Sequence, residues 1–379
     1  MEFQELTFAH IDLLRKYYVN CNYRLCEYSA GVKLMWRHYL HPAFAQVAGC
    51  LVISNVIEGV TQFDFPIPGE EGDVDAALTA IEAYCTRRNI RPVISVVPES
   101  MAPALVTRWP KFTVLNEEAW KDYVYLAEDL ATLAGRRYSG QRNHINKFRK
   151  EHPTAVFRPL TAADEPMLQR FWQDYAQEFS KHSDTAEKEL VLAREMFAHL
   201  DTGAFRAGGM EEDGRLLGIC LAEKCGDTLV DHIEKALYSC QGVYPAMVQA
   251  FAAHYGGDCR FINREDDARD RGLRISKRQY LPTAMDSKMS FRVGSQLDLL
   301  DRVPDISCRR LTLTALEEGD KAAYNALCLD DARNRLWGYD WHKDYDGTPL
   351  EDYFLKTARE DFRLRRCVNF AVRLEGKCV

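Results

Sequence analysis

A short pattern that recurs three times at one domain-sized interval most constrains how this chain can fold. It reads LTFAHIDLLRKYY from Leu6, LTAADEPMLQRFW from Leu160 and LTALEEGDKAAYN from Leu313, so the copies start 154 and 153 residues apart (160 minus 6 and 313 minus 160). In each copy a short strand ends at Leu-Thr, and the hydroxyl residue or an acid shortly after it can cap an amphipathic helix. Since only 66 residues follow Leu313 (379 minus 313), the repeat predicts two whole α/β units and the first half of a third.

The repeat and the length together set the expected domain boundaries. A chain of 379 residues exceeds the usual size of one compact domain. We expect a first domain over residues 1–134, a basic linker over 135–152, a second domain that carries the site over 153–300 and a partial third unit over 301–379. A natural protein that continues past Val379 into a complete third unit is a hypothesis that a natural stop codon at this point would remove.

Composition and charge exclude several classes of protein. The net charge is −7, which argues against a surface adapted as a whole to nucleic acid, while a local basic groove stays compatible with it. No stretch approaches the roughly 18 to 20 apolar residues that cross a bilayer, and the N-terminus carries acids where a signal peptide would be basic. The twelve cysteines show neither a CxxC pair nor zinc-finger spacing. We therefore expect reduced thiols, no metal site and a cytoplasmic protein without integral membrane contact.

The order of elements in the second unit is typical of one known fold. Apolar periodicity predicts helices and strands in turn, and a favoured two-residue turn at Asp213-Gly214 joins two of the strands. The predicted helices cover Glu165–Phe179, Glu187–His199, Pro245–Tyr255 and Asp267–Gly272, and the strands include Leu229–Ala236 and CRFINRE. This order resembles the GNAT acetyltransferase fold. The expected fold class is mixed α/β (α+β): two tandem GNAT-like domains with mixed, mainly antiparallel sheets flanked by helices, plus a partial C-terminal GNAT-like segment.

The GNAT resemblance implies a cofactor loop after the fourth strand. In that family the loop reads Gln/Arg-x-x-Gly-x-Gly/Ala, and its backbone N–H groups hold a pyrophosphate at a helix N-terminus. The matching residues here begin at Gln241 and Gly242 and continue as Val-Tyr-Pro-Ala, which departs from the family pattern. Acyl-CoA is therefore one of two donors kept open. The Asn that follows the fifth strand and lies near the cofactor in the family corresponds to Asn263.

Ionisable residues alternate along the strand that precedes this loop. We expect His232 and Glu234 on one face and Lys235 on the other. An ionisable pair on a central strand is costly unless it is paired or faces a wet cleft. Glu234, with His232 as its partner, is the candidate base for deprotonating an ammonium group. Tyr244 could donate to a developing oxyanion or protonate a leaving group; an edge-strand ion pair and a packing tyrosine are the alternatives.

A dense charged run begins where the predicted strand CRFINRE ends. Such strand ends are where open α/β sheets place ligand sites. Arg suits phosphate or carboxylate by its bidentate fork and Lys suits them as a point charge, and an Asp could orient an attacking amine. The expected binding residues in and near this run are Asn263, Arg264, Asp266, Asp267, Arg274, Lys277 and Tyr280, with Lys235 on the neighbouring strand. The alternative is a solvated helix face held by pairs such as Asp270 with Arg274.

A basic segment lies between the first two units. Residues 135–150 hold six Lys or Arg and no acid, with aromatic residues interleaved, which suits backbone phosphates and base stacking. Arg142, Asn143 and His144 are its candidate binding residues. A basic linker helix with no partner is the alternative.

These segments together resemble a known bacterial family, the one related to the C-terminal domain of phosphatidylglycerol lysyltransferase. The resemblance covers about residues 1–295 and rests on Arg136–Phe148, His232–Ala236, Gly242–Pro245 and Asn263–Pro282. Better-known members carry two GNAT-like units and move an amino acid from aminoacyl-tRNA to a lipid headgroup, and Fem-type peptidyl transferases share the plan.

The resemblance implies a transferase that moves an acyl or aminoacyl group from aminoacyl-tRNA or acyl-CoA to an amine or hydroxyl. It implies no tightly bound cofactor, a small-molecule or phospho-substrate, and tRNA as a possible partner. Two other classes stay open. A degenerate GNAT pair could bind a nucleotide or a small amine without catalysis, and a metalloenzyme would need a third ligand beside His232 and the Asp266–Asp267 pair.

Overall fold

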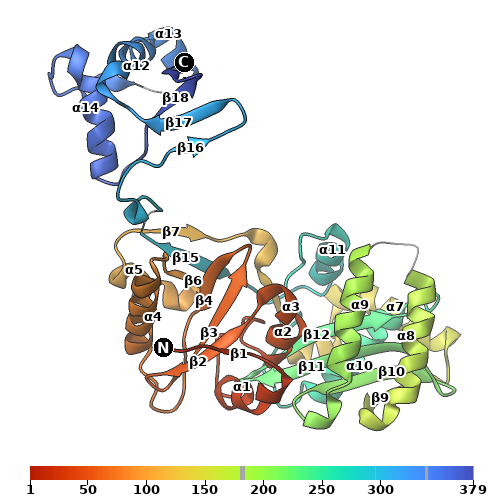
Figure 1. Ribbon diagram of the computed structural model, residues 1–379. Coiled ribbons are helices and arrows are strands. Elements are labelled where there is room, and N and C mark those ends of the chain that lie inside the picture. Colours follow the sequence, from red (N-terminus) through yellow and green to blue (C-terminus); the bar gives the residue numbers. More distant parts are fainter. Residues whose placement is uncertain (180–183, 295, 338–339, 379) are drawn as a thin grey trace. The chain divides into compact units, whose positions relative to one another are not determined.

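The computed structural model describes residues 1–179, 184–294, 296–337 and 340–378, with 44% helix and 26% strand. The chain divides into a larger unit, Met1–Cys85 with Pro92–Arg292, and a smaller unit, Thr86–Arg91 with Val293–Val379. Mixed sheets flanked by helices in a GNAT-like arrangement confirm the expected fold class (Figure 1).

The larger unit contains two mixed β-sheets. Its strands are β1 (Gln4–Glu5), β2 (Ala43–Val47), β3 (Cys50–Ile57), β4 (Val60–Asp64), β5 (Ile67–Pro68), β6 (Val93–Pro98), β7 (Phe112–Leu115), β8 (Asp122–Leu126), β9 (Val156–Leu160), β10 (Arg206–Glu212), β11 (Arg215–Cys225), β12 (Thr228–Ala236), β13 (Phe261–Asn263), β14 (Ala284–Asp286) and β15 (Lys288–Val293). The first sheet has the order β1-β2-β3-β4-β6-β15-β7, with β5 paired to β3, and the second has the order β14-β8-β13-β12-β11-β10-β9.

Helices flank these sheets (Figure 1). They are α1 (Ile11–Tyr18), α2 (Ala30–Met35), α3 (Arg37–Leu40), α4 (Val74–Arg88), α5 (Ala102–Arg108), α6 (Ala127–Thr132), α7 (Ser139–Glu151), α8 (Glu165–Phe179), α9 (Asp184–Phe197), α10 (Val243–Tyr255) and α11 (Arg271–Gln279). Helix α10 packs on strands β9 to β12, α8 packs on β11, and α7 packs against α10. Among the helices that the structure describes, none has both the length and the apolar character needed to span a bilayer.

The two sheets of the larger unit exchange strands. Strand β8 comes before the basic segment in sequence, yet it lies between β13 and β14 in the second sheet. Strand β15 comes at the end of the second repeat, yet it lies between β6 and β7 in the first sheet. A boundary at residue 134 therefore does not separate the sheets. The exchange also carries Asp122 and Lys288, the first residues of β8 and β15, away from their sequence neighbours.

Each of the three repeat copies opens with the same local structure. Thr7, Thr161 and Glu317 are N-caps of a 3₁₀ turn with a capping box, in which each N-cap side chain accepts from the third residue of the turn and that residue's side chain accepts from the N-cap backbone. Because the first two caps directly follow Leu6 and Leu160, the matching leucine of the third copy is Leu316, which is buried as Leu6 and Leu160 are. The register that starts the third copy at Leu313 is wrong by three residues.

Several predicted elements have the expected bounds, and one helix is displaced. Helix α8 covers Glu165–Phe179 as predicted, and the turn Asp213-Gly214 joins β10 to β11 with positive φ at both residues, as a type I′ turn requires. The helix predicted over Asp267–Gly272 is wrong, since α11 begins at Arg271. Ala268 and Arg269 adopt positive φ, which a helix does not allow, and the Asp270 side chain then caps α11 by accepting from the Leu273 N–H at 2.7 Å.

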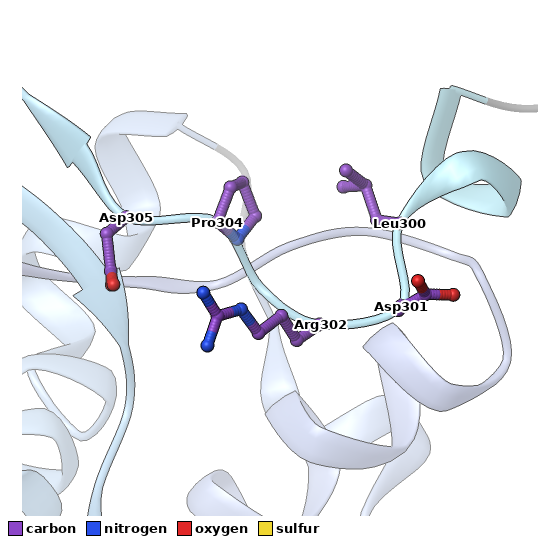
Figure 2. Close-up of a pocket in the computed structure, with 5 residues that line it drawn as sticks. All are labelled: Leu300, Asp301, Arg302, Pro304 and Asp305. Atoms are coloured by element: carbon purple, nitrogen blue, oxygen red, sulfur yellow. The ribbon is translucent and has the colours of Figure 1, made fainter.

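The smaller unit has one four-stranded sheet and three helices in its described part. The strands, in the order β16-β17-β18-β19, are β16 (Ile306–Ser307), β17 (Leu311–Ala315), β18 (Phe370–Leu374) and β19 (Lys377–Cys378), and the helices are α12 (Lys321–Cys328), α13 (Asp331–Trp337) and α14 (Leu350–Arg363). A shallow surface pocket of about 610 Å³ lies in the segment before β16, where Arg302 and Pro304 stand beside Leu300, Asp301 and Asp305 (Figure 2). Its lining is one continuous stretch of chain and includes none of the predicted site residues.

Candidate active site

Three carboxylates and a thiol converge on one lysine in the larger unit. The Lys288 ammonium lies 2.7 Å from Glu27, 2.9 Å from Asp122 and 3.0 Å from Asp266, and 3.3 Å from the sulfur of Cys26. These five residues, which we name the acid cluster, come from the loop before α2, the start of β8, the loop after β13 and the start of β15. The strand exchange is what brings them together.

The acid cluster is buried on the side of Lys288 and Asp122 and open on the side of the other two acids. The side chains of Asp122 and Lys288 are 0% and 6% exposed, whereas those of Glu27 and Asp266 are 19% and 27% exposed. Burial alone would lower the pKa of Lys288, but the charges of Asp122, Cys26, Glu27 and Asp266 raise it, so the lysine is cationic. Burial raises the pKa of Glu27, against the opposing charge of Lys288. Glu27 is therefore a partly exposed carboxylate of increased basicity.

Part of the acid cluster has the spacing of a metal site. Ligand atoms of Cys26, Glu27 and Asp122 lie within 4.8 Å of one another. The Lys288 ammonium is within 3.3 Å of all three residues and supplies the positive charge between them. Burial, the largest effect, and the charges of Asp122 and Glu27 raise the pKa of the Cys26 thiol, against the opposing charge of Lys288.

His232 is buried between the two halves of the larger unit. Its Nδ1 is 2.8 Å from Glu265, and its side chain is 1% exposed. Burial opposes protonation, but the hydrogen bond and charge of Glu265 and the charge of Glu223 outweigh it and raise the pKa of His232. Its Nε2 has no hydrogen-bond partner among the described residues and faces Gly31, where an added Cβ would lie 2.2 Å away. Glu223 holds the same helix start by accepting from the Ala30 and Gly31 N–H groups at 2.6 and 3.1 Å.

Glu234 is engaged by a buried arginine. Arg264 donates to it through Nε at 2.7 Å and Nη2 at 2.5 Å, and the guanidinium lies 4.7 Å from the ring centre of Tyr280. Burial would raise the pKa of Glu234, but the charge of Arg264 and hydrogen bonds from Asp231 and Arg264 lower it to about 2. Asp231 is buried, and burial together with the Glu234 charge raises its pKa well above the usual range. The Arg264 charge and the hydrogen bonds therefore favour the ionised form of Glu234 and make it a weak base.

The expected pairing of His232 with Glu234 is not what the structure contains. Strand β12 has a bulge, because Leu221 pairs with Ile233 while its neighbour Ala222 pairs with Asp231. The extra residue, His232, interrupts the alternation, so His232 contacts Glu265 and Glu234 contacts Arg264. The proposed base and its orienting partner thus belong to two separate ion pairs.

The residues of the charged run mostly support one another. The Asn263 amide donates to the Arg24 carbonyl at 2.6 Å and to Asp122 at 2.8 Å, and it accepts from the Glu265 N–H. Asp267 accepts from Tyr123 and from Arg274 in a bidentate pair. Lys277 donates to the carbonyls of Arg264 and Asp266, and burial lowers its pKa. The first part of the run, up to Asp270, is therefore a braced loop, and the second part is the largely exposed helix α11.

The predicted phosphate loop packs against the basic helix α7. Gly242 has a φ of +84° at the start of α10, and an added Cβ would lie 2.6 Å from the His144 carbonyl oxygen. Lys147 donates to Gln241 at 2.7 Å, and the Tyr244 hydroxyl accepts from the Ala236 N–H at 3.2 Å. Arg142 donates to two carbonyls, those of Leu133 and Gly135. Asn143 and His144 have exposed side chains, and Lys235 is partly buried and has interactions of its own.

Sequence reasoning missed most of the acid cluster. Asp266 was among the predicted residues, but Cys26, Glu27, Asp122 and Lys288 were not, nor were Glu223 and Glu265. Asp122 directly before the apolar strand residues Tyr-Val-Tyr-Leu was a usable signal, since a carboxylate there needs a partner. Lys288 carried no such signal, because its role depends on an exchange between sheets that local patterns do not encode.

Comparisons with known proteins connect this geometry to a family. The family model for the C-terminal part of phosphatidylglycerol lysyltransferase matches residues 21–289, well over half of the chain. The chain belongs to this family. The matched range contains every residue of the acid cluster and both ion pairs of β12, and it confirms the resemblance drawn from the sequence. A search of curated proteins found no match.

Solved structures share the fold of this member of the phosphatidylglycerol lysyltransferase family. A conserved protein of unknown function from Bacteroides thetaiotaomicron superposes with a TM-score of 0.70 at 24% identity, covering 78% of this chain and 100% of that one. The C-terminal domain of a putative lysylphosphatidylglycerol synthetase from Agrobacterium fabrum has a TM-score of 0.52 at 9% identity, covering 70% and 88% of the two chains. L-PGS from Bacillus licheniformis has a TM-score of 0.51 at 10% identity, covering 68% and 86%. At these identities the likenesses show the fold alone.

Proposed function

We propose that this chain transfers an acyl or aminoacyl group from an activated donor to an amine or hydroxyl, by direct attack in the acid cluster. The observation that carries the proposal is the open side of that cluster. Glu27 and Asp266 offer partly exposed carboxylates there, and Lys288 fixes both in place. Carboxylates in a partly buried site bind an ammonium group by charge-assisted hydrogen bonds, so an amino-acid donor or an amine acceptor fits this side.

The proposed reaction needs one base and no covalent enzyme intermediate. The acceptor's nitrogen or oxygen attacks the donor's carbonyl carbon, the new amide or ester bond forms, and the bond to the donor's oxygen or sulfur breaks. Glu27 takes the proton from the attacking group, because burial raises its pKa toward the working range of a general base. The proton then passes to the leaving oxygen or sulfur. Glu234, the base expected from the sequence, would first have to leave Arg264.

The two base assignments can be separated by two isosteric substitutions. Glu27→Gln keeps the shape of the acid cluster and removes the proton acceptor, so it should reduce turnover by about 10²-fold or more while the fold is retained. Glu234→Gln removes one partner of a buried ion pair and should mainly destabilise the protein. Full turnover in Glu27→Gln, with turnover lost in a folded Glu234→Gln, would return the role of base to Glu234.

For the donor, aminoacyl-tRNA is favoured over acyl-CoA. Helix α7 presents Arg149 and Lys150 to solvent, with Arg136 exposed just before it, and such a stripe suits a polyanion. The backbone of α7 packs against Gly242 at the N-terminus of α10, which is where a GNAT-type site would hold a pyrophosphate. Both features support an RNA-borne donor.

Binding measurements test the donor before any turnover assay. Nuclease-sensitive small RNA should co-purify with the protein and should be lost in Arg149→Glu/Lys150→Glu. The same double charge reversal at Arg363 and Lys356 of α14, which are also exposed, serves as the matched control. A thermal shift with acetyl-CoA and none with RNA would support acyl-CoA, and ligand binding without transfer from either donor would support the non-catalytic module.

A further inference from the structure

Two loops carry the partly exposed carboxylates of the acid cluster, and each loop contains a residue with positive φ. Glu27 lies in the loop before α2, and Asp266 lies in the loop after β13. Arg24, shortly before Glu27, has a φ of +60°, and Glu265, directly before Asp266, has a φ of +56°. Such a conformation is uncommon for residues other than glycine, and where it occurs the surrounding structure holds it in place. The groups that hold these two loops therefore set the positions of the two carboxylates.

One asparagine connects the backbones of the two loops. The buried Asn263 amide donates to the Arg24 carbonyl at 2.6 Å, and its oxygen accepts from the Glu265 N–H at 2.7 Å. The same amide donates to Asp122 at 2.8 Å, and the Glu265 carbonyl accepts from the Tyr123 N–H at 3.1 Å. Both loops are thus fixed to strands β13 and β8.

His232 lies between the same two segments of chain. As the extra residue of the β12 bulge it leaves the alternation of its strand, and its Nδ1 lies 2.8 Å from Glu265. The other edge of the ring meets Gly31 of α2, where an added Cβ would lie 2.2 to 2.7 Å from Nε2, Cδ2 and Cε1. The imidazole is therefore a spacer between the segment that carries Glu27 and the loop that carries Asp266.

The hydrogen bond to Glu265 is what an imidazole adds at this position. The charged groups that act on the ring are Glu265 from the loop after β13 and Glu223 from β11, and Glu223 itself accepts from the Ala30 and Gly31 N–H groups. Among the described residues the His232 Nε2 has no hydrogen-bond partner, and a buried unpaired nitrogen costs stability. An apolar side chain would fill the space without that cost, but it could not donate to Glu265.

We propose that His232 is a positioning residue that sets the separation of Glu27 and Asp266 through its hydrogen bond to Glu265 and its contact with Gly31. Its part in the reaction rests on the proposed function, in which Glu27 is the base and Asp266 binds an ammonium group. Because its side chain is 1% exposed, His232 acts through the two loops and not by contact with a substrate. A base must lie about 2.6 to 3.2 Å from the atom whose proton it takes, and a displacement of about 1 Å can reduce a rate roughly 10²-fold.

Two substitutions of His232 separate its hydrogen bond from its volume. In His232→Asn the amide nitrogen is bonded to Cγ, as Nδ1 is in histidine, so a donor to Glu265 is kept. His232→Leu fills the space and has no donor. Amide hydrogen exchange of residues 263–267 should become about tenfold faster in His232→Leu and should return toward the wild-type rate in His232→Asn. This measurement needs neither a donor nor an acceptor.

Turnover connects the positioning to the reaction. With total aminoacyl-tRNA as the donor and ethanolamine, which offers an amine and a hydroxyl, as the acceptor, we expect kcat to fall about tenfold or more in His232→Leu and to recover in His232→Asn. The KM for the donor should stay unchanged, because the RNA would bind at α7. Glu265→Gln weakens the same hydrogen bond from its other partner and is the second variant if His232→Leu does not fold, which urea unfolding reports.

The outcomes distinguish this inference from the proposed function. Unchanged exchange of residues 263–267 in a folded His232→Leu protein would overturn the positioning role. An equal loss of kcat in folded His232→Leu and His232→Asn would also overturn it, because the hydrogen bond would then not be the cause. Full turnover in Glu27→Gln would instead remove the assigned base, and the exchange measurement would still decide whether His232 holds the loop.

Discussion

Substitution of Gly31 by alanine should break the contact between helix α2 and His232 of strand β12. Gly31 lies on α2, and the built Cβ would be 2.2 Å from Nε2, 2.4 Å from Cδ2 and 2.7 Å from Cε1 of the imidazole. Ordinary contact between such atoms is about 3.5 to 4 Å, so the ring or the helix must move by more than an ångström. The ring is anchored to Glu265 at 2.8 Å, and Glu223 holds the α2 end through the Gly31 N–H. Neither side can yield without losing a hydrogen bond to a charged group.

The expected cost follows from these contacts. Overpacking a tight interior costs about 1 to 3 kcal/mol, and loss of one hydrogen bond to a charged group adds about 1.5 to 3 kcal/mol. Alanine gains up to about 1 kcal/mol over glycine inside a helix. The net loss should therefore be roughly 1.5 to 5 kcal/mol in the free energy of unfolding. With His232→Ala already present the obstacle is gone, and Gly31→Ala should then stabilise the protein by a few tenths to about 1 kcal/mol.

A double-mutant cycle in urea measures this change of sign. Tryptophan fluorescence follows unfolding of the four proteins, and hydrogen exchange of the β12 amides reports whether the damage is local to His232. An equal cost of Gly31→Ala in both backgrounds would refute the steric reasoning, because the effect would then belong to the backbone of α2. A wild-type-like Gly31→Ala protein would show that α2 moves away from β12 freely.

Three further predictions concern the charged groups. Lys288→Met leaves Glu27, Asp122 and Asp266 without their common cation, and it should lower the free energy of unfolding at pH 7 by about 3 to 5 kcal/mol. Adding Asp122→Asn should restore part of that stability, which thermal unfolding measures. No recovery would mean that the substitution removed packing contacts and that the lost charge was not the cause. The pKa of His232 is raised in the folded protein. Its contribution to stability is therefore complete below about pH 6.5 and is lost as the pH rises through the folded pKa. Over that pH window, the urea midpoint of the wild type should fall more than the urea midpoint of His232→Gln. The pKa of Glu234 is lowered to about 2 in the folded protein. Its contribution to the free energy of unfolding is therefore present above about pH 4.5 and is lost as the pH falls toward 2. An acid unfolding curve that Glu234→Gln leaves unchanged would contradict a strong ion pair between Glu234 and Arg264.

The sequence was sufficient to predict the repeated strand-and-helix elements, but not to predict how these elements pair and pack with one another. Local signals predicted α8, the Asp213-Gly214 turn and the strand of His232 and Glu234, because hydrophobic period and turn chemistry are properties of neighbouring residues. The bulge at His232 was not visible, since alternation continues in the letters even where the backbone adds a residue. The third copy was misregistered at Leu313 because Leu-Thr occurs there by chance, while the capping box that defines the repeat is at Glu317.

The acid cluster lay beyond sequence reasoning for a topological reason. Residues 27, 122, 266 and 288 are separated by 95, 144 and 22 positions, and the longest of these intervals spans the second repeat up to the loop after β13. They meet because β8 joins the second sheet and β15 returns to the first, so Asp122 is placed by the register of the second sheet and Lys288 by that of the first. Asp122 therefore lies on a strand that the first repeat contributes to the second sheet, and Lys288 lies on a strand that the second repeat contributes to the first sheet. Neither half of the larger unit can build the acid cluster alone, and the ion pairs of Lys288 report directly on whether the two halves are assembled.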